Sequence, residues 1–345
     1  MKKTTHQPIT IIALMLTTSM LFAFSQPKDR EVTRVVFYNV ENLFDTIDDP
    51  TTLDNEFLPG SKKKWGKKRY DEKITNLGKV LLAISEERDP GIIGLCEVEN
   101  RQVVEDLADH LSLMTYGRLN YHVVHEESPD LRGIDVAFMY NPQIFVYESH
   151  TVHDIKFEEI GLNITTRDIL EVQGKIDNKR VHFFVNHWPS RRGGVEASQP
   201  KRLFVAQVLK ARLDMIMVED PNARVLIMGD FNDETDNKSI SEILISPNQG
   251  SRVDLVNLMT ELDEKGRGTY NYRGNWNMLD QFIVSNDFSY QKSLNIKKGS
   301  TKIFIAPWMM FEHEEFGNTP SRTFGGPNYY GGYSDHLPIL VDIIH

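Results

Sequence analysis

The stretch GGYSDHLPIL, residues 331–340, places Asp335 and His336 side by side in front of an apolar run that predicts a buried strand. The glycines before the pair allow the backbone to turn sharply. A carboxylate binds hard cations, and an imidazole exchanges a proton near neutral pH, so the pair suits metal and proton chemistry. Taken alone, the dipeptide is equally compatible with an ordinary surface turn.

Three other apolar runs end in the same way. They are VVFYNVENLF (35–44), GIIGLCEVE (91–99) and RVLIMGDFND (224–233), and each predicts a strand. Their ends carry Asn39 with Glu41, Glu97, and Asp230 with Asn232. Because α/β proteins collect the polar groups of a site at strand ends, these side chains predict a shared site. A single polar strand end is more often a turn, but four of them, with Asp280 in LDQF and His187 in NHW, are hard to explain as turns.

Apolar periodicity predicts the other elements of the chain. Helices are expected over 70–84 and 103–111, and from Ser198 to Ile216. Strands are expected over 121–127, 134–140, 168–176, 180–188 and 278–285, with a hairpin turn at Asp177-Asn178. The segments 236–278 and 305–333 are predicted to be rich in loops. Strands and helices alternate throughout, so the sequence predicts the α/β class.

Composition limits the classes of protein that this chain can belong to. With 345 residues, of which 40% are hydrophobic, it can bury a large core. The single cysteine, Cys96, cannot form an intramolecular disulfide and is predicted to be a small core residue. The formal net charge of −10 argues against tight non-specific binding of duplex nucleic acid, although local arginines and metal ions can still hold a phosphate.

Residues 1–25 have the pattern of a signal peptide. Lys2 and Lys3 precede an apolar stretch from Ile9 to Phe24, and small residues follow at its end. The stretch is short and contains Thr and Ser, which favours export over a membrane anchor, the alternative reading. We therefore expect a secreted or periplasmic protein with no stable membrane insertion after removal of the signal, and one domain over residues 26–345.

The quoted strand ends resemble those of a known family. YNVEN, CEVEN, VNHWPSR, MGDFND, LDQFIVS and YSDHLPI occur in the order typical of the endonuclease/exonuclease/phosphatase superfamily, and they cover nearly all of residues 34–345. The chain resembles a secreted bacterial member of the deoxyribonuclease I-like type. This resemblance implies a four-layer α/β/β/α sandwich, in which two packed mixed β-sheets are flanked by helices and the site lies at one end.

The resemblance also implies roles for individual residues. A Mg²⁺ or Mn²⁺ ion is expected on the oxygen ligands Asn39, Glu41, Glu97 and Asp335, a set that suits these ions better than zinc. Catalytic roles are expected for His187, Asp230, Asn232, Asp280 and His336, with Asp280 orienting His336. Hydrolysis of a phosphodiester needs a positioned water, a proton acceptor, charge neutralisation and help for the leaving oxygen, and this set supplies all four.

Three arginines are candidates for binding the substrate phosphate, namely Arg132, Arg191 and Arg192. Asp135, three residues after Arg132, is expected to orient His187. The basic cluster at 62–69 is more often a solvated loop, but its Trp65 is also a candidate for stacking on a base.

Together these features predict a monomeric, metal-dependent phosphodiester hydrolase, with a secreted or periplasmic endonuclease or exonuclease acting on nucleic acid as the favoured form. The alternatives are a phosphatase or a lipid-headgroup phosphodiesterase of the sphingomyelinase or phosphoinositide type, and an inactive binding module on the same fold. The loops 45–69 and 305–333 decide the substrate, and their conformations cannot be predicted from the sequence.

Overall fold

The computed structural model describes residue 1 and residues 31–246, 254–286, 288 and 294–345. The predicted signal peptide therefore lies, apart from its first residue, outside the described residues. Within the described part of the chain, no helix has both the length and the apolar character needed to cross a membrane.

The two large sheets are both mixed. The first has the strand order β13-β19-β1-β2-β4-β3, with β14 also beside β19, and its only parallel pair among the described strands is β1 with β2. Its strands are β1 Val32–Leu43, β2 Pro90–Val98, β3 His122–His125, β4 Asp135–Tyr140, β13 Asn295–Ile296, β14 Lys302–Ile303 and β19 Ile339–Ile344.

The second sheet has the order β5-β6-β7-β8-β12-β9, and β7 runs parallel to β8. Its strands are β5 Val146–His153, β6 Ile169–Ile176, β7 Lys179–His187, β8 Arg224–Asp230, β9 Leu255–Asn257 and β12 Asp280–Ser285. The predicted hairpin joins β6 to β7, and Asp177 and Asn178 at its turn have φ of 47° and 60°. Asp and Asn tolerate this left-handed conformation better than most residues, which explains their place in a two-residue turn.

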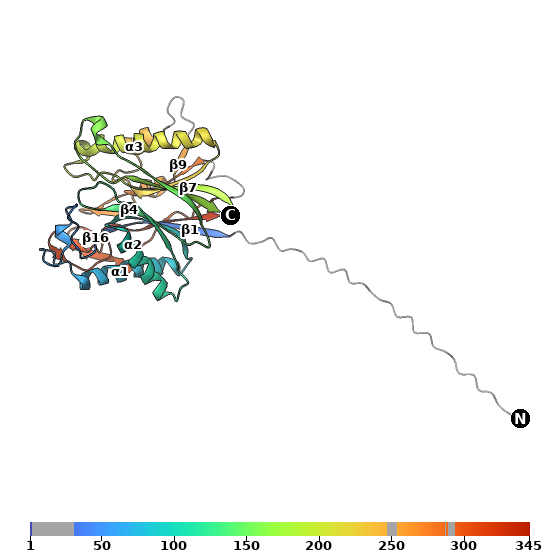
Figure 1. The fold of residues 1–345 in the computed structure, drawn as a ribbon, viewed down its shortest axis with the longest axis horizontal. Helices are drawn as coiled ribbons and strands as arrows, with labels where there is room; N and C mark the ends of the chain where they lie inside the picture. The colour runs from blue at the N-terminus through green and yellow to red at the C-terminus, as the bar shows by residue number, and fades with distance from the viewer. Residues whose placement is uncertain (2–30, 247–253, 287, 289–293) are drawn as a thin grey trace. The chain divides into compact units, whose positions relative to one another are not determined.

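Helices cover the outer face of each sheet, as Figure 1 shows. Helices α1 Lys67–Ser85 and α2 Arg101–Met114 pack on the first sheet, and α3 Val195–Glu219 packs on the second. A third apolar core, which includes Phe37, Cys96 and Phe183, fills the space between the sheets. Successive apolar side chains along the strands point to opposite faces, so each sheet is apolar on both faces and packs against a helix layer and the other sheet. The predicted four-layer sandwich is confirmed.

Short elements occupy the segments that were predicted to be loops. Residues 305–333 contain two small hairpins rather than a loop alone, and 236–278 contains further short strands. Two short helices lie outside these segments, namely η1 Asn55–Phe57 and η2 Phe157–Ile160. The short elements within the segments are the π-helical segment η3 Ser239–Leu244, α4 Thr260–Glu264, β10 Tyr270–Tyr272, β11 Asn275–Asn277, η4 Pro307–Met309, β15 Met310–His313, β16 Gly317–Pro320, β17 Phe324–Gly325 and β18 Asn328–Tyr329.

Two predictions about local structure are wrong. Helix α3 begins at Val195 rather than Ser198, because Gly194, with φ of 113°, makes the turn and the Ser198 hydroxyl donates back to the Gly194 carbonyl within the helix. Trp65 is fully buried, and its indole N–H donates to the Phe44 carbonyl at 2.9 Å. An indole that closes the core in this way cannot stack on a nucleic-acid base.

Candidate active site

Strand direction brings the predicted site residues to one edge of the sandwich. The parallel strands β1, β2, β7 and β8 end there, and the strands antiparallel to them, β12 and β19, begin there. Asp230 pairs in register with His187 on one side and with Asp280 on the other. Register alone therefore places three side chains from distant parts of the sequence next to one another.

Asp230 lies at the centre of this group and is buried. Its Oδ2 accepts a hydrogen bond from Asn39 Nδ2 at 3.1 Å, and it lies 3.7 Å from His187 Nε2 and 3.8 Å from His336 Nε2. Asn232 donates its backbone N–H to Asp230 Oδ1 at 2.9 Å. The two imidazoles thus approach the same carboxylate oxygen, one from the end of β7 and the other from the segment before β19.

His336 is held between two carboxylates. Its Nδ1 lies 2.7 Å from Asp280 Oδ2, and its ring packs against Tyr270 with 4.9 Å between the ring centroids. Burial lowers the pKa of His336, but the neighbouring Asp280 and Asp230 outweigh burial and hold this pKa well above the usual value. The charged form of His336 is therefore favoured.

His187 has the opposite surroundings. It is buried, and its Nδ1 has no hydrogen-bond partner among the described residues. Burial, followed by the positive charges of Arg167, Arg132 and His336, holds the pKa of His187 well below the usual value. The neutral form of His187 is therefore favoured, in contrast to His336.

The four expected oxygen ligands fall into two neighbouring groups. Glu97, which is partly exposed, lies with its Oε1 3.5 Å from Asn39 Nδ2 and 3.9 Å from His187 Nε2. Glu41 accepts backbone hydrogen bonds from Thr323 at 2.6 Å and from Phe324 at 3.3 Å. Asp335 forms an ion pair with Arg322, whose Nε lies 4.0 Å from Glu41 Oε1.

The chemistry of this donor set fits a hard divalent cation. Burial and then the Asp335 carboxylate raise the pKa of Glu41 to about 7, although Lys73 and Arg322 lower it. Lys73 and Arg322 therefore do not fully compensate the negative charge of the Glu41 and Asp335 carboxylates. Mg²⁺ and Mn²⁺ prefer carboxylate oxygens of this kind as ligands. Glu97 and Asn39 have no contact with Arg322 or with the 323–324 backbone among the hydrogen bonds and ion pairs of the described residues, and each accepts one backbone N–H at 2.9 Å, from Asn42 and Glu41 respectively.

Several site residues have backbone conformations that non-glycine residues rarely adopt. Glu41, Asn42, Glu97 and Asn232 have φ of 50°, 54°, 63° and 51°. Such conformations cost of order 1–3 kcal/mol each, and they persist where surrounding structure imposes them for a function. These four residues lie at the polar strand ends that predicted the site, so the backbone conformations and the sequence indicate the same location.

The predicted arginines do not form one group. Arg132 and Arg192 line a pocket of about 250 Å³, together with Arg167 and Lys201. Arg191 lies elsewhere: its Nε donates to the Asn232 carbonyl at 2.7 Å, and its Nη2 donates to Asn237 Oδ1 at 2.9 Å. The guanidinium of Arg191 thus supports the Asn232 loop and is already satisfied by protein groups.

Asp135 does not contact His187 in this structure. Its Oδ1 accepts from the backbone N–H of Ser128 at 2.9 Å, and its Oδ2 lies 3.4 Å from His125 Nε2. The β3–β4 connection turns the carboxylate toward these partners, which a sequence spacing from Arg132 could not reveal.

Sequence reasoning missed three cations near the site: Lys73, Arg167 and Arg322. Lys73 on α1 donates to Thr323 Oγ1 at 2.7 Å, Arg167 pairs with Asp130 at 2.9 Å, and Arg322 pairs with Asp335. No motif marks Lys73 or Arg322, and the sequence TTRD around Arg167 would have stood out only as a charged pair entering a predicted strand.

Comparison with solved structures shows the same fold in proteins of low sequence identity. The human Nocturnin catalytic domain with bound sulfate anion shares 15% identity, with 92% of this chain and 98% of that chain covered and a TM-score of 0.53. A mannosyl-6-phosphatase of Bacteroides thetaiotaomicron shares 14%, with 91% and 100% covered and a TM-score of 0.56.

D. rerio TDP2 complexed with single strand DNA product shares 11% identity, with 90% of this chain and 98% of that chain covered and a TM-score of 0.50. A search of curated proteins found no match. The model of the endonuclease/exonuclease/phosphatase family matches residues 34–345, which span the whole sandwich described above. The chain therefore belongs to the endonuclease/exonuclease/phosphatase family.

Proposed function

We propose that this protein is a divalent-metal-dependent phosphodiester hydrolase that cleaves nucleic acid. The observation that carries the proposal is the pair of imidazoles that flank Asp230 Oδ2 at 3.7 and 3.8 Å, in surroundings that shift their pKa values in opposite directions. Hydrolysis of a phosphodiester needs one group that accepts a proton from water and another that assists the leaving oxygen. His187 is suited to the first task and His336 to the second.

The remaining residues position these two groups. Asp280 holds the His336 ring through Nδ1, Asp230 presents a carboxylate between the imidazoles, and Asn232 donates its backbone N–H to that carboxylate. A divalent ion bound by Glu97 and Asn39 would neutralise charge on the phosphate oxygens. Water is limited at the centre because Asp230, His187 and His336 are all buried.

An aromatic pocket beside the site favours nucleic acid as the substrate. The pocket has a volume of about 820 Å³ and reaches Asp335. Tyr272, Phe311 and Tyr330 line it and are 53%, 56% and 64% exposed. Large exposed rings grouped next to a hydrolytic centre are suited to stacking on bases, and each stacked base contributes about 1–3 kcal/mol.

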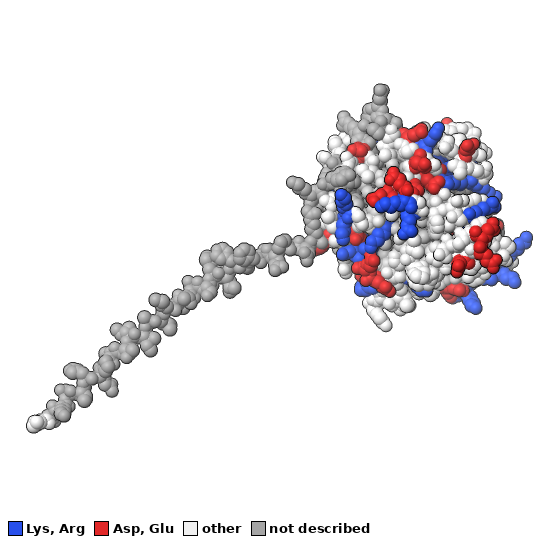
Figure 2. Space-filling model, turned by 180° about the vertical axis from the view of Figure 1, so that it is seen from behind, with Lys and Arg blue, Asp and Glu red and all other residues white. Residues whose placement is uncertain are grey.

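The pocket of Arg132, Arg167, Arg192 and Lys201 adds a site for a further phosphate, and two of its arginines, Arg167 and Arg132, lower the pKa of His187. On the face shown in Figure 2, however, basic and acidic side chains are interspersed rather than gathered into one basic surface. We therefore expect a short footprint on a single strand rather than tight binding along a duplex.

A second candidate function is hydrolysis of a sugar phosphate. Glu312 and Glu314 line the same aromatic pocket, and carboxylates beside aromatic rings are suited to accept hydrogen bonds from sugar hydroxyls. An inactive module would not need the opposed pKa values of His187 and His336.

A substrate panel tests the proposal. Turnover of a single-stranded oligonucleotide, bis-p-nitrophenyl phosphate, mannose 6-phosphate and sphingomyelin should be measured with Mg²⁺, with Mn²⁺ and with EDTA. We expect the oligonucleotide and the small diester to be cleaved only with metal, and Glu97→Gln to require more metal. Cleavage of mannose 6-phosphate without any diester would replace the proposal by the second candidate, and turnover undiminished by EDTA would overturn the metal requirement.

The aromatic pocket has its own test. Phe311→Ala should lower oligonucleotide cleavage by about tenfold, because one stacked base is lost, while bis-p-nitrophenyl phosphate turnover is unchanged. Tyr116→Ala is the matched control, since Tyr116 is fully exposed and lies outside the pocket. Equal losses on both substrates would show that Phe311 supports the fold rather than the binding of the oligonucleotide.

We also propose export, supported by the pattern of residues 1–25. Expression of the full chain in a bacterial host should yield a shortened protein in the periplasm or medium, with its N-terminus near residue 26. An uncleaved chain that remains in the cytoplasm would contradict this proposal.

A further inference from the structure

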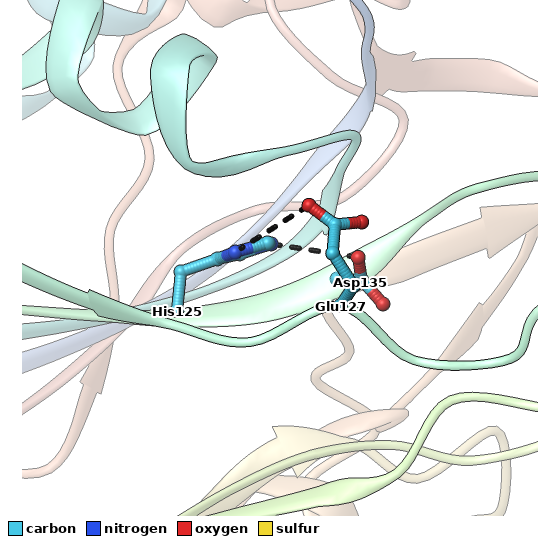
Figure 3. A group of neighbouring side chains, drawn as sticks. All are labelled: His125, Glu127 and Asp135. Carbon is cyan, nitrogen blue, oxygen red and sulfur yellow. Dashed lines mark ion pairs between the residues drawn. The ribbon is translucent and has the colours of Figure 1, made fainter. Parts of the chain in front are cut away.

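A second group of metal-binding side chains lies outside the site described above. His125 ends β3, Glu127 follows it, and Asp135 begins β4; we call these three residues the His125 cluster (Figure 3). His125 Nε2 lies 3.4 Å from Asp135 Oδ2, and Nδ1 lies 4.0 Å from Glu127 Oε1. One ligand atom from each residue falls within 4.8 Å of the other two.

The two buried members of the cluster face each other through atoms that form no hydrogen bond, although the other carboxylate oxygen of Asp135 accepts from Ser128. His125 is 3% exposed and Asp135 is 1% exposed, yet His125 Nε2 and Asp135 Oδ2 form no hydrogen bond. Among the residues that the structure describes, no Lys or Arg forms an ion pair with Asp135 or Glu127. Buried polar atoms are normally satisfied, so these two orphaned atoms indicate that a further group belongs between them.

A group of histidine and carboxylate side chains around Glu171 shows the contrast. The Glu171 carboxylate also lies between two imidazoles, 2.8 Å from His153 Nε2 and 2.9 Å from His182 Nδ1. Arg212 adds a bidentate pair to Glu171 at 2.8 and 3.1 Å, so the Glu171 carboxylate is neutralised by a protein cation. The His125 cluster has two carboxylates and lacks such an arginine, which leaves room and charge for an external cation.

The spacing in the cluster matches a bound transition ion. Bonds of about 2.0–2.2 Å from zinc to nitrogen and oxygen, at tetrahedral angles, place two ligand atoms about 3.4 Å apart. The His125 Nε2 to Asp135 Oδ2 distance already has this value. The Glu127 side chain is 66% exposed, so it can rotate to supply a third ligand and leaves a path for the ion from solvent.

We propose that the His125 cluster binds a divalent transition ion of the zinc class through His125, Glu127 and Asp135. The nitrogen ligand favours Zn²⁺ or Co²⁺ over Mg²⁺ and Mn²⁺, which prefer oxygen ligands. The site is separate from the oxygen ligands at Glu97, although Asp135 pairs with Val98 in the neighbouring strand. This proposal does not depend on the function proposed above.

Such an ion would tie together the two ends of the segment 126–134. This segment carries Asp130, whose carboxylate pairs with Arg167 at 2.9 Å, and Arg132, whose Nε lies 3.5 Å from the same Asp130. The ion would therefore hold in place the loop that presents positive charge to His187. The role we assign to the ion is structural, because the hydrogen bonds and ion pairs of the cluster among the described residues do not include His187, Asp230 or His336.

The test measures metal binding in the Glu97→Gln background, which weakens the oxygen site. Zn²⁺ titration calorimetry and the visible absorption of Co²⁺ report affinity and coordination without any assay of activity. We expect one Zn²⁺ per chain and the intense absorption of four-coordinate Co²⁺. In the same background, Glu127→Gln should weaken Zn²⁺ binding at least about tenfold, and His125→Gln should abolish it.

Glu126→Gln is the matched control, because Glu126 is the exposed neighbour and pairs with His150 at 3.0 Å. It should bind Zn²⁺ as the parent does. Glu127→Gln alters an exposed side chain, so the comparison survives even if His125→Gln fails to fold. The proposal is overturned if the parent binds no Zn²⁺ or Co²⁺, or if Glu127→Gln and Glu126→Gln bind Zn²⁺ equally.

Discussion

The two sides of Asp230 carry the same residue in opposite states. On one side, His187 at the end of β7 is buried beside Arg167 and Arg132, and its pKa is lowered. On the other, His336 before β19 lies between Asp280 and Asp230, and its pKa is raised despite burial. Burial alone would make both rings neutral.

The difference teaches that charge partners, rather than burial, assign the roles of the two histidines. Titratable groups whose environments push their pKa values apart provide an acid and a base at one pH. Burial also raises the pKa of Asp230 to about 7, although His336 lowers it, so the carboxylate between the rings holds its proton more readily than an exposed one. The whole group is thus poised for proton transfer near neutral pH.

Removing either ring should have the largest effect. His187→Ala and His336→Ala should each lower kcat on a small diester by about 10²- to 10⁴-fold, because each loses a positioned proton acceptor or donor. Steady-state kinetics with saturating metal measures this. His122→Ala, which removes an exposed imidazole on β3, is the control and should be neutral. A ring whose removal leaves kcat near the parent value has only a structural role.

Asp280→Asn should have the next largest effect, because it removes a charge and keeps the shape. The pKa of His336 should fall, since Asp280 is the strongest of the groups that raise it. The imidazolium is then lost at lower pH, so the alkaline limb of the kcat/KM profile should move to lower pH. A pH–rate profile checks this, and an unchanged alkaline limb would show that His336 is not the acid that the profile reports.

Arg132→Gln should have the smallest effect, and in the opposite direction. Arg132 lowers the pKa of His187, so its removal should raise that pKa and move the acidic limb of the profile to higher pH. Because the Arg132 side chain is 49% exposed and screened, a shift below about one pH unit is expected. Arg88→Gln, an exposed arginine distant in sequence, gives the baseline. If the alkaline limb moved instead, the prediction that Arg132 lowers the pKa of His187 would be contradicted.

Much of this arrangement could be predicted from the strand ends. Asn39, Glu97 and Asp230 each follow an apolar run, and strand direction then forces them to one edge. The Asp280 to His336 contact was implied by resemblance, and the structure contains it at 2.7 Å. Strand periodicity is local, so it identifies both the strand and the residue at its end.

Other features depend on long-range packing and could not be predicted. Trp65 lies in a basic segment, and only the fold shows that its ring fills the core against Phe57 and Phe324. Strand β5 was missed because most of its side chains are exposed and it lacks an apolar pattern. Arg322 reaches Asp335 from a segment predicted to be a loop, where no periodicity constrains the side chain.

The opposed protonation of the two imidazoles can be observed directly. In metal-free protein labelled with ¹⁵N in its histidine rings, and with His187→Gln and His336→Gln used for assignment, the ring nitrogen shifts report each protonation state. At about pH 7 we predict a neutral His187 and a charged His336 with protons on both nitrogens. Two rings that are neutral together at this pH, or that titrate together near the usual histidine value, would contradict the account.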